Sequence, residues 1–303
     1  MKKLLLPFLI FALAGPAFAG SEMDGKAAVS TSAADTSGTV PLDVFSSEHA
    51  YIFESDLNHG GSFGKQAEIQ NEIEYGHRVH LSGNLYVHVG LAYDRFDFGG
   101  TGAPVPNHLQ SLSGVIGIDV MHGSDVGAFI QVRPGFYTQN DFGISSFDIP
   151  IMLGRIFVVR QDKLYLFAGA NAAFLRGGYP VIPLVGVIWM PCDQWRVSAV
   201  LPEPKLIYSP TKNLDIYLGG ELAGGSFRTD TNDNITPHKL SGAQVDFTDY
   251  RAGLGLTYTV NSSVSLDVGA GYSIERHFAF HRAGENFRTD PSPFLRLELK
   301  ASF

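Results

Sequence analysis

Long stretches in which apolar and polar residues alternate constrain the fold of this 303-residue chain more than any other feature. Every second residue from Val264 to Ile274 is apolar or aromatic, and the residues between them are Ser, Asp and Gly. The stretch Tyr250–Val260 alternates in the same way. A period of two is the pattern of a β-strand with one apolar face. Such stretches recur from about residue 50 onward and predict an all-β protein.

The alternating stretches are too long for an ordinary soluble sheet. Strands in soluble proteins usually have about 5–6 residues, whereas a tilted transmembrane strand needs roughly 9–11. Tyr250 and Tyr258 bracket the apolar face of one stretch, which places their rings roughly 20 Å apart along the membrane normal. This spacing suits two aromatic girdles around an apolar band. It favours a transmembrane barrel over a lipocalin-like barrel with an apolar interior.

We therefore predict a single antiparallel transmembrane β-barrel of about 12 strands, with 10–14 strands left open. The predicted strands are residues 67–80, 84–98, 109–121, 126–138, 146–159, 164–176, 181–190, 195–208, 213–228, 243–260, 264–280 and 292–303. A weaker run at 51–57 could add another. The segment 195–208 contains Leu201-Pro202-Glu203-Pro204 and has short turns on both sides. Because proline cannot donate to a β-ladder, this segment is either one kinked strand or hides a chain reversal.

The first residues have the pattern of a secretory signal peptide. A positive start with Lys2 and Lys3 precedes the apolar run Leu4–Ala14, and small residues follow at Ala17 and Ala19. We predict a signal peptide over residues 1–19, a flexible periplasmic tail over 20–50, and an outer-membrane β-barrel over 51–303. The expected location after cleavage near Ala19 is the outer membrane of a Gram-negative bacterium.

Composition narrows the classes further. Only 17% of the residues are charged and the formal net charge is −8, with no cluster of Lys and Arg. These values argue against a nucleic-acid partner. The single cysteine, Cys192, excludes an internal disulfide. After the signal peptide, the longest apolar stretch is Val181–Met190, about half of what a transmembrane helix requires.

The C-terminal stretch alternates down to its last residue. We predict an outward apolar face that also serves as the signal for the barrel assembly machinery, made of Leu295, Leu297, Leu299 and Phe303. The partners expected from this pattern are outer-membrane lipid and that machinery. The oligomeric state stays open.

Two segments of the chain carry a resemblance. They are Gly186-Val187-Ile188-Trp189-Met190-Pro191, continued by Trp195-Arg196-Val197 and Leu201-Pro202-Glu203-Pro204-Lys205-Leu206-Ile207-Tyr208, and Gly271-Tyr272-Ser273-Ile274-Glu275-Arg276. Together they resemble an uncharacterised family of Gram-negative outer-membrane β-barrels, known only as a domain of unknown function. The resemblance covers most of the chain from about residue 60. It implies location and architecture, and no activity, ligand or catalytic residue.

Polar residues on the predicted inward faces are the candidate functional residues. The predicted lumen lining is Glu68, Glu72, Glu74, Asp249, Arg251, Asp267, Glu275, His277, Arg296, Glu298 and Lys300. The first and last strands of a closed barrel are neighbours, so acidic residues of the first clear strand should meet basic residues of the last ones across the closing seam. This arrangement either sets a transverse field that selects solutes or fills the lumen with salt bridges. Arg133, Arg155 and Asn171 are further polar positions with the same two interpretations.

The pattern gives little support to catalysis or to a metal site. Ser273, Glu275 and His277 share a predicted strand face, but positions four apart on a strand are separated by about 13 Å. We therefore expect no catalytic residue, no metal site and no cofactor.

The function predicted from these features is a narrow passive channel for small polar solutes. The alternative is a closed structural or surface-interaction barrel that acts through its extracellular loops. A third hypothesis is an outer-membrane hydrolase.

Overall fold

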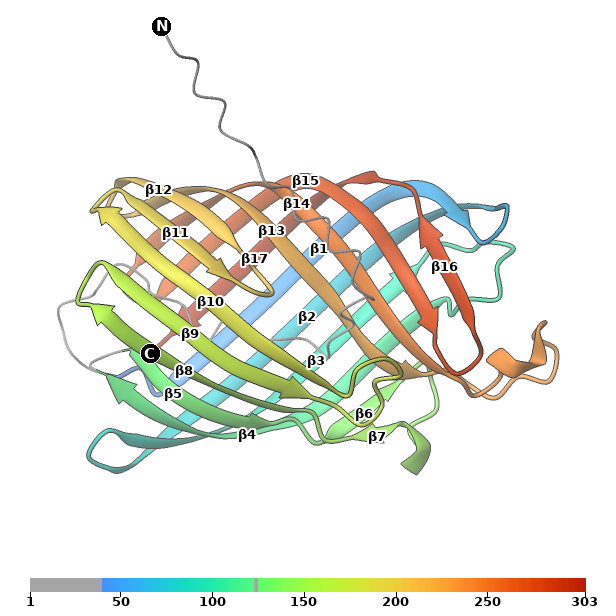
Figure 1. The fold of residues 1–303 in the computed structure, drawn as a ribbon, viewed down its shortest axis with the longest axis horizontal. Helices are drawn as coiled ribbons and strands as arrows, with labels where there is room; N and C mark the ends of the chain where they lie inside the picture. Colours follow the sequence, from blue (N-terminus) through green and yellow to red (C-terminus); the bar gives the residue numbers. More distant parts are fainter. Residues whose placement is uncertain (1–39, 123–124) are drawn as a thin grey trace, which may run out of the picture.

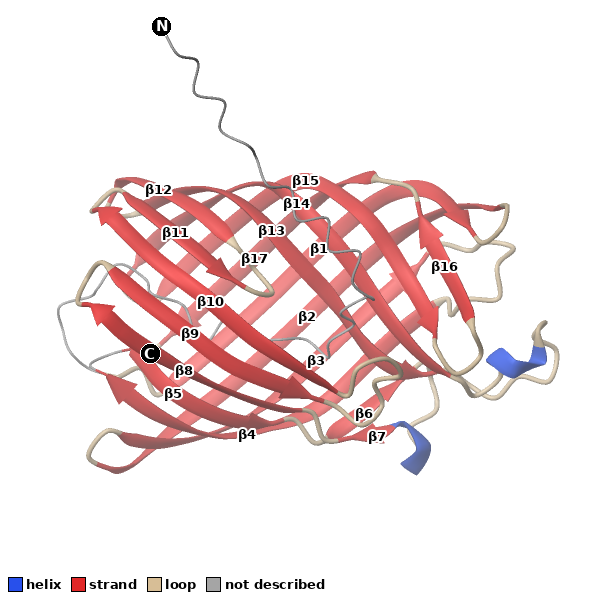
Figure 2. Ribbon diagram, in the orientation of Figure 1, coloured by secondary structure: helices blue, strands red, loops and turns tan. Residues whose placement is uncertain are grey.

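A computed structural model of the chain describes residues 40–122 and 125–303. The predicted signal peptide and the first twenty residues of the predicted tail lie outside this part. Within it, regular structure is almost entirely β, with two short 3-10 turns at Ile144–Ser146 and His238–Leu240 (Figure 2). Among the described residues, no helix has the length and apolar character that crossing a membrane requires.

The strands are β1 (Asp43–Asn58), β2 (Ser62–Ser82), β3 (Leu85–Phe98), β4 (His108–His122), β5 (Asp125–Val132), β6 (Gly135–Thr138), β7 (Phe147–Asp148), β8 (Ile151–Arg160), β9 (Leu164–Ala172), β10 (Val181–Cys192), β11 (Trp195–Val200), β12 (Lys205–Thr211), β13 (Leu214–Arg228), β14 (Gln244–Asn261), β15 (Val264–Phe280), β16 (Glu285–Thr289) and β17 (Ser292–Ser302). Each strand pairs antiparallel with the next along the wall, and β17 pairs back with β1. The sheet is therefore a closed barrel (Figure 1).

The seventeen strands of this described region occupy fourteen positions in the wall. β6 continues β5 along the edge of β4, and β7 precedes β8 in one position. β16 and β17 both lie between β15 and β1. The barrel thus has fourteen strand positions, within the predicted range but two more than the favoured twelve.

Two features account for the difference in strand number. The segment 195–208 hides a chain reversal, because residues 201–204 turn between the short strands β11 and β12. The weak run near residue 51 belongs to the full-length strand β1, which begins at Asp43, inside the predicted tail. Alternation in β1 is hard to see because His49 faces outward whereas Ala50 and Ile52 are buried inside.

The two ends of the barrel differ. The end that holds Asp43 and Phe303 also holds short turns, at residues 83–84, 161–163, 193–194, 212–213 and 262–263 (Figure 1, left). The opposite end holds the longer connections, at residues 99–107, 139–146, 173–180 and 229–243. Between the predicted strands 264–280 and 292–303, residues 285–289 form the further strand β16. In outer-membrane barrels the short turns are periplasmic and the long loops extracellular.

Apolar side chains face outward and charged side chains face inward. Along β17, Leu295 and Leu297 are exposed whereas Arg296 is only 4% exposed. The same contrast recurs around the wall, with Leu91 and Val185 among the most exposed residues. A soluble barrel would have the opposite arrangement, so the structure confirms the predicted transmembrane β-barrel.

Arg155 on β8 departs from this pattern. It is exposed, and it lies opposite Ala128 and Ala168, so it faces outward between Leu153 and Phe157. The prediction that Arg155 lines the lumen is wrong, because the register of β8 places it on the outer face. A lipid-facing arginine costs about 2–4 kcal/mol at the membrane midplane and less near the interfaces.

The hairpin of β11 and β12 is much shorter than its neighbours. β11 pairs with β10 only from Gly186 onward, so Val181–Val185 of β10 extend past it without a ladder partner on that side. On the other side, β13 pairs with β12 up to Gly219 and then continues to Arg228, whose backbone meets Thr138 of β6. The wall is therefore lower at this hairpin, where β11 and β12 have 6 and 7 residues, than at β10 and β13, which have 12 and 15.

Closure through β1 can be tested with engineered cysteines. Ser47 of β1 lies directly opposite Leu299 of β17, so Ser47→Cys with Leu299→Cys should form a disulfide in a Cys192→Ser background. The control pair Ser47→Cys with Leu295→Cys is offset by about 13 Å and should stay reduced. Mass spectrometry after oxidation reports both. Equal oxidation of the two pairs would contradict the register.

Candidate functional site

The interior is crossed at mid-height by a set of ionic side chains that we name the central charged cluster. Its members are Glu48, Glu68, Tyr217, Glu221, Asp249, Arg251, Asp267, Arg276 and Arg296. They come from six consecutive strands on one side of the wall, namely β13, β14, β15, β17, β1 and β2. Each sits at an inward position of its strand, so the closed sheet brings them together.

Arg251 of β14 is the first of the two arginines that link this cluster. Its guanidinium lies 2.5 Å from Asp249, 3.2 Å from Glu221 and 3.4 Å from Glu68. The side chain is 1% exposed, and its guanidinium also lies 5.8 Å from the centre of the Phe294 ring. Glu68 lies on β2, which is not a neighbour of β14, so this contact spans the lumen.

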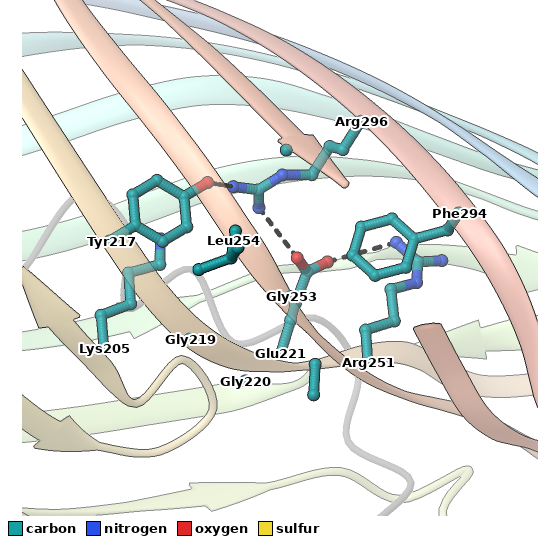
Figure 3. Close-up of a pocket in the computed structure, with 12 residues that line it drawn as sticks. Lys205, Tyr217, Gly219, Gly220, Glu221, Arg251, Gly253, Leu254, Phe294 and Arg296 are labelled. Atoms are coloured by element: carbon teal, nitrogen blue, oxygen red, sulfur yellow. Dashed lines mark hydrogen bonds and ion pairs between the residues drawn. The ribbon is translucent and has the colours of Figure 1, made fainter. Parts of the chain in front are cut away.

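Arg296 of β17 is the second linking arginine. It lies 2.8 Å from Glu221 (Figure 3), 2.7 Å from Asp267 and 3.5 Å from Glu48. It also donates to the hydroxyl of Tyr217, which in turn donates to Asp267. Glu221 therefore bridges the two arginines, and the cluster forms one connected network.

A glycine makes room for the tyrosine of this network. A Cβ atom on Gly255 would lie 2.1 Å from the Tyr217 ring. Without that atom, the ring lies flat on β14 and its hydroxyl reaches Asp267 and Arg296. The Gly residues on the polar faces of β14 and β15 therefore have a packing role.

The lumen beside the cluster is narrow. A cavity of about 20 Å³ lies between Lys205, Tyr217, Glu221, Arg251 and Arg296 (Figure 3). A second cavity of about 40 Å³ lies nearer the short turns, among residues that include Glu74, Arg78, His88, Asp119 and Gln131. Each has room for only one or a few water molecules.

Nine of the eleven predicted lumen residues lie at inward positions. Those buried in the interior are Glu68, Asp249, Arg251, Asp267, Arg296 and Glu298. Glu72, Glu74 and Lys300 are partly exposed at the same faces. Among them, Glu74 pairs with Arg133 and Lys300 lies 3.2 Å from Glu298.

The other two predicted lumen residues, Glu275 and His277, do not line the lumen. A β-bulge on β15 breaks the alternation, because Arg251 pairs with Ser273 whereas the preceding Tyr250 pairs with Glu275. Beyond the bulge, Arg276 points inward and Glu275 and His277 point outward. Sequence reasoning missed Arg276, which binds Ser55 and the carbonyl of Gln66 and lies 3.7 Å from Glu68.

The closing seam also differs from the prediction. Strand β1 lies between β2 and β17, so the acidic face of β2 is not adjacent to the last strand. Glu48 of β1 supplies the acid at the seam, where it pairs with Arg296. Glu68 still meets basic residues, but it does so across the lumen.

Toward the long-loop end, the lumen is filled by what we name the aromatic cluster. Its buried members are Leu57, Phe96, Phe98, Leu109, Tyr137, Leu175, Phe227, Leu240, Val245, Phe247, Phe278, Phe280 and Phe287. Phe96 of β3 lies 6.1 Å from Phe227 of β13 and 5.2 Å from Phe247 of β14, measured between ring centroids. These strands are not neighbours in the wall, so the rings meet across the lumen.

Polar contacts hold the loops over this cluster. Glu285 lies 2.5 Å from Lys239 and 2.9 Å from His59. These ion pairs link the start of β16 to the loop 229–243 and to the turn between β1 and β2. The hydrogen bond from Lys239 holds the pKa of Glu285 below its usual value. Asp246 accepts from the backbone N–H groups of Gly177 and Gly178, which anchors the loop 173–180.

The sector of the interior formed by β8–β11 is apolar. Inward side chains of β8–β11 form a second core of Met152, Phe167, Ile182, Leu184, Ile188 and Val200. Asn171 of β9 is buried near the long-loop end of this core, where its Oδ1 accepts a hydrogen bond from Arg176. The interior therefore has an apolar sector at β8–β11, whereas the rest of its wall also carries buried polar and charged side chains.

Within the described ranges, no group of three or more His, Cys, Asp and Glu side chains is arranged to hold a metal ion. Ser273 donates to Asp249 and belongs to the charged network. It does not face His277, because the bulge separates the two residues onto opposite faces.

Comparisons with known proteins concern the fold. No protein-family model matches the chain, and no curated protein sequence matches it. A TodX deltaS2S3 mutant, a monoaromatic hydrocarbon channel, is similar over 88% of this chain and 91% of that chain, with a TM-score of 0.51 and 10% identity. An outer-membrane channel from Pseudomonas putida F1 covers 88% of this chain and 96% of its own, with a TM-score of 0.46 and 11% identity. The likeness to the TodX mutant shows that the chain has the fold of an outer-membrane β-barrel.

Removing one partner from the central charged cluster should destabilise the barrel. Arg251→Leu leaves Asp249 and Glu68 without their buried cation, so we expect unfolding to become easier by about 3–5 kcal/mol. The control Arg288→Gln removes an arginine at the rim, 57% exposed and 3.6 Å from Glu275, and should cost less than about 1 kcal/mol. Urea unfolding in detergent, followed by tryptophan fluorescence, measures both. Similar losses for the two variants would refute a structural role of the cluster.

Proposed function

We propose that this protein is a narrow outer-membrane channel for small polar solutes. The observation that carries the proposal is the central charged cluster inside a closed barrel of fourteen strand positions. Eight-stranded barrels are filled by side chains, and barrels of 16–18 strands leave an aqueous channel. Fourteen positions give an interior of intermediate width. The outer-membrane channel fold supports the same class of function.

The net charge of the central charged cluster favours cations over anions. The central charged cluster contains five carboxyl groups and three guanidinium groups. Rings of carboxylates in a pore attract cations and repel anions. The solutes that fit this interior are therefore small, polar and neutral or positively charged.

Passage requires movement at the long-loop end. We infer that the aromatic cluster closes the lumen there. The cavity beside the central charged cluster and the one nearer the short turns each have room for only a few waters. The conformation described is a closed one. Opening would displace the rings that meet across the lumen, together with the loops anchored above them.

Single-channel recording in a planar lipid bilayer tests the proposal. The refolded protein should show discrete conductance steps with a preference for cations. Glu72→Gln removes a partly exposed inward charge and should lower the cation-to-anion permeability ratio by a factor of about two or more. Glu275→Gln, on the outer face, is the matched control and should leave the ratio unchanged.

The aromatic cluster supplies a second test. Phe98→Ala removes a ring that contacts both Phe247 and Phe278, so we expect more frequent or larger conductance steps. Phe53→Ala removes a ring from the outer face and should not alter conductance. A decrease with Phe98→Ala would show that the cluster does not close the pore.

The filled lumen also favours the alternative function, a closed barrel that acts through its extracellular loops. The loop 229–243 and its anchor to Glu285 would then carry the function. A correctly folded and inserted protein without conductance, both in its natural form and as Phe98→Ala, would support this alternative and refute the channel.

Export and assembly complete the proposal. Signal-peptide cleavage near Ala19 would deliver the chain to the periplasm, and the outward face of β17 would engage the assembly machinery. Leu295, Leu297, Leu299 and Phe303 are all exposed on that face or at its end. Mass spectrometry of the purified protein locates the mature N-terminus, and deletion of Phe303 should reduce the amount of inserted barrel.

A further inference from the structure

The outward-facing Arg155 is the starting point for an inference that is independent of channel activity. It lies in the apolar outer wall, between the exposed side chains of Leu153 and Phe157. Its guanidinium carbon lies 5.0 Å from the centre of the Phe157 ring. Among the residues described, no carboxylate pairs with it. A lipid-facing cation is costly, so a partner from outside the chain is expected.

The direction of the side chain indicates where this partner lies. β8 runs toward the short turn 161–163, and Phe157 is nearer to that turn than Arg155. Since the guanidinium rests over the Phe157 ring, it is directed toward the periplasmic edge of the wall. Five residues of tilted strand separate Arg155 from Arg160, a height of about 13 Å. A long cationic side chain at this depth reaches toward the interface.

The periplasmic end of the same hairpin carries two more cations. Arg160 is exposed and lies opposite Leu164, on the outward face, and Lys163 is exposed in the turn. On the next strand, Trp189 faces outward opposite Leu164 and is 49% exposed, at the level where aromatic girdles meet the headgroups. The three cations therefore form a line from the apolar wall down to the headgroup region.

The side chains next to Arg155 on the outer face are small. Ala128 and Ala168 lie opposite it on the two neighbouring strands, whereas larger side chains such as Ile130 and Leu166 stand on either side. We name these two alanine positions beside the arginine the strip, and we expect their short side chains to leave room for an acyl chain.

We propose that the outer face of β5, β8 and β9 binds an anionic phospholipid of the periplasmic leaflet. The headgroup phosphate accepts charge-assisted hydrogen bonds from Arg155, with Arg160 and Lys163 providing further positive charge. An acyl chain lies along the strip at Ala128 and Ala168. Arg155, Arg160 and Lys163 supply three positive charges against the one carboxylate of Asp162 in the same turn, so the site attracts a negatively charged headgroup.

A second copy of this chain fits the site less well. Two copies related by a two-fold axis through this face would bring two Arg155 side chains together, because an isologous interface places like residues near each other. The repulsion between them argues for a lipid and against a symmetric dimer.

Native mass spectrometry of the folded barrel in detergent tests the proposal, with phosphatidylglycerol as the anionic probe and phosphatidylethanolamine for comparison. We expect phosphatidylglycerol to bind more tightly. Arg155→Leu should weaken its binding roughly tenfold, about the effect of losing one charge-assisted hydrogen bond. Arg155→Lys retains the charge and should lose less.

Two controls make the test specific. Lys212→Gln removes an exposed cation from a different periplasmic turn and should leave lipid binding unchanged. Gel migration before and after heating reports whether each variant is folded, and Arg155→Leu should fold because leucine suits the lipid-facing wall.

The proposal is wrong if Arg155→Leu binds phosphatidylglycerol as tightly as the natural protein, or if Lys212→Gln causes the same loss. It is also wrong if Arg155→Leu dissociates an oligomer without changing lipid binding, since the partner would then be a second copy. None of these outcomes depends on conductance, so the lipid site and the channel can fail separately.

Discussion

The need to pair every backbone hydrogen-bonding group within the wall governs the whole structure. A β-sheet in lipid has no water to bond its edges, so it must close on itself. Closure here depends on β1, which pairs with β2 on one side and with β16 and β17 on the other. Once the wall is closed, strict alternation sends each leucine of β17 outward and each charge between them inward.

The inward charges then determine the character of the interior. In a barrel of this width, arginines and carboxylates cannot all stay hydrated, and a buried charge must find a partner. Arg251 and Arg296 share Glu221, and each reaches further carboxylates on other strands. The same ionic links that make the interior polar enough for solutes also connect strands that are not neighbours in the wall. Stability and narrowness of the lumen are therefore consequences of one network.

Much of this architecture could be predicted from the sequence because period-two alternation is a direct readout of one apolar face. The long strands β14, β15 and β17 were predictable for that reason, as were the inward positions of Arg251 and Arg296. Alternation fails where both faces are mixed, as in β1, and where the backbone departs from regular geometry. The bulge on β15 reversed the faces of Glu275 and His277, and the turn at residues 201–204 divided one predicted strand into two. The aromatic cluster could not be predicted, because its rings come from strands that meet only across the lumen.

The short hairpin of β11 and β12 has a consequence for how the barrel fluctuates. Local opening costs least where few ladder hydrogen bonds must break, and β11 holds β12 through only four paired positions. Next to it, the upper part of β10 is bonded to β9 on one side alone. Amide hydrogens in this sector should therefore exchange with solvent before those of β14 and β15, which are bonded along nearly their whole length. The β11–β12 hairpin and the neighbouring part of β10 are therefore the least stable sector of the wall, and this sector lies far from β1 and β17, which close the barrel.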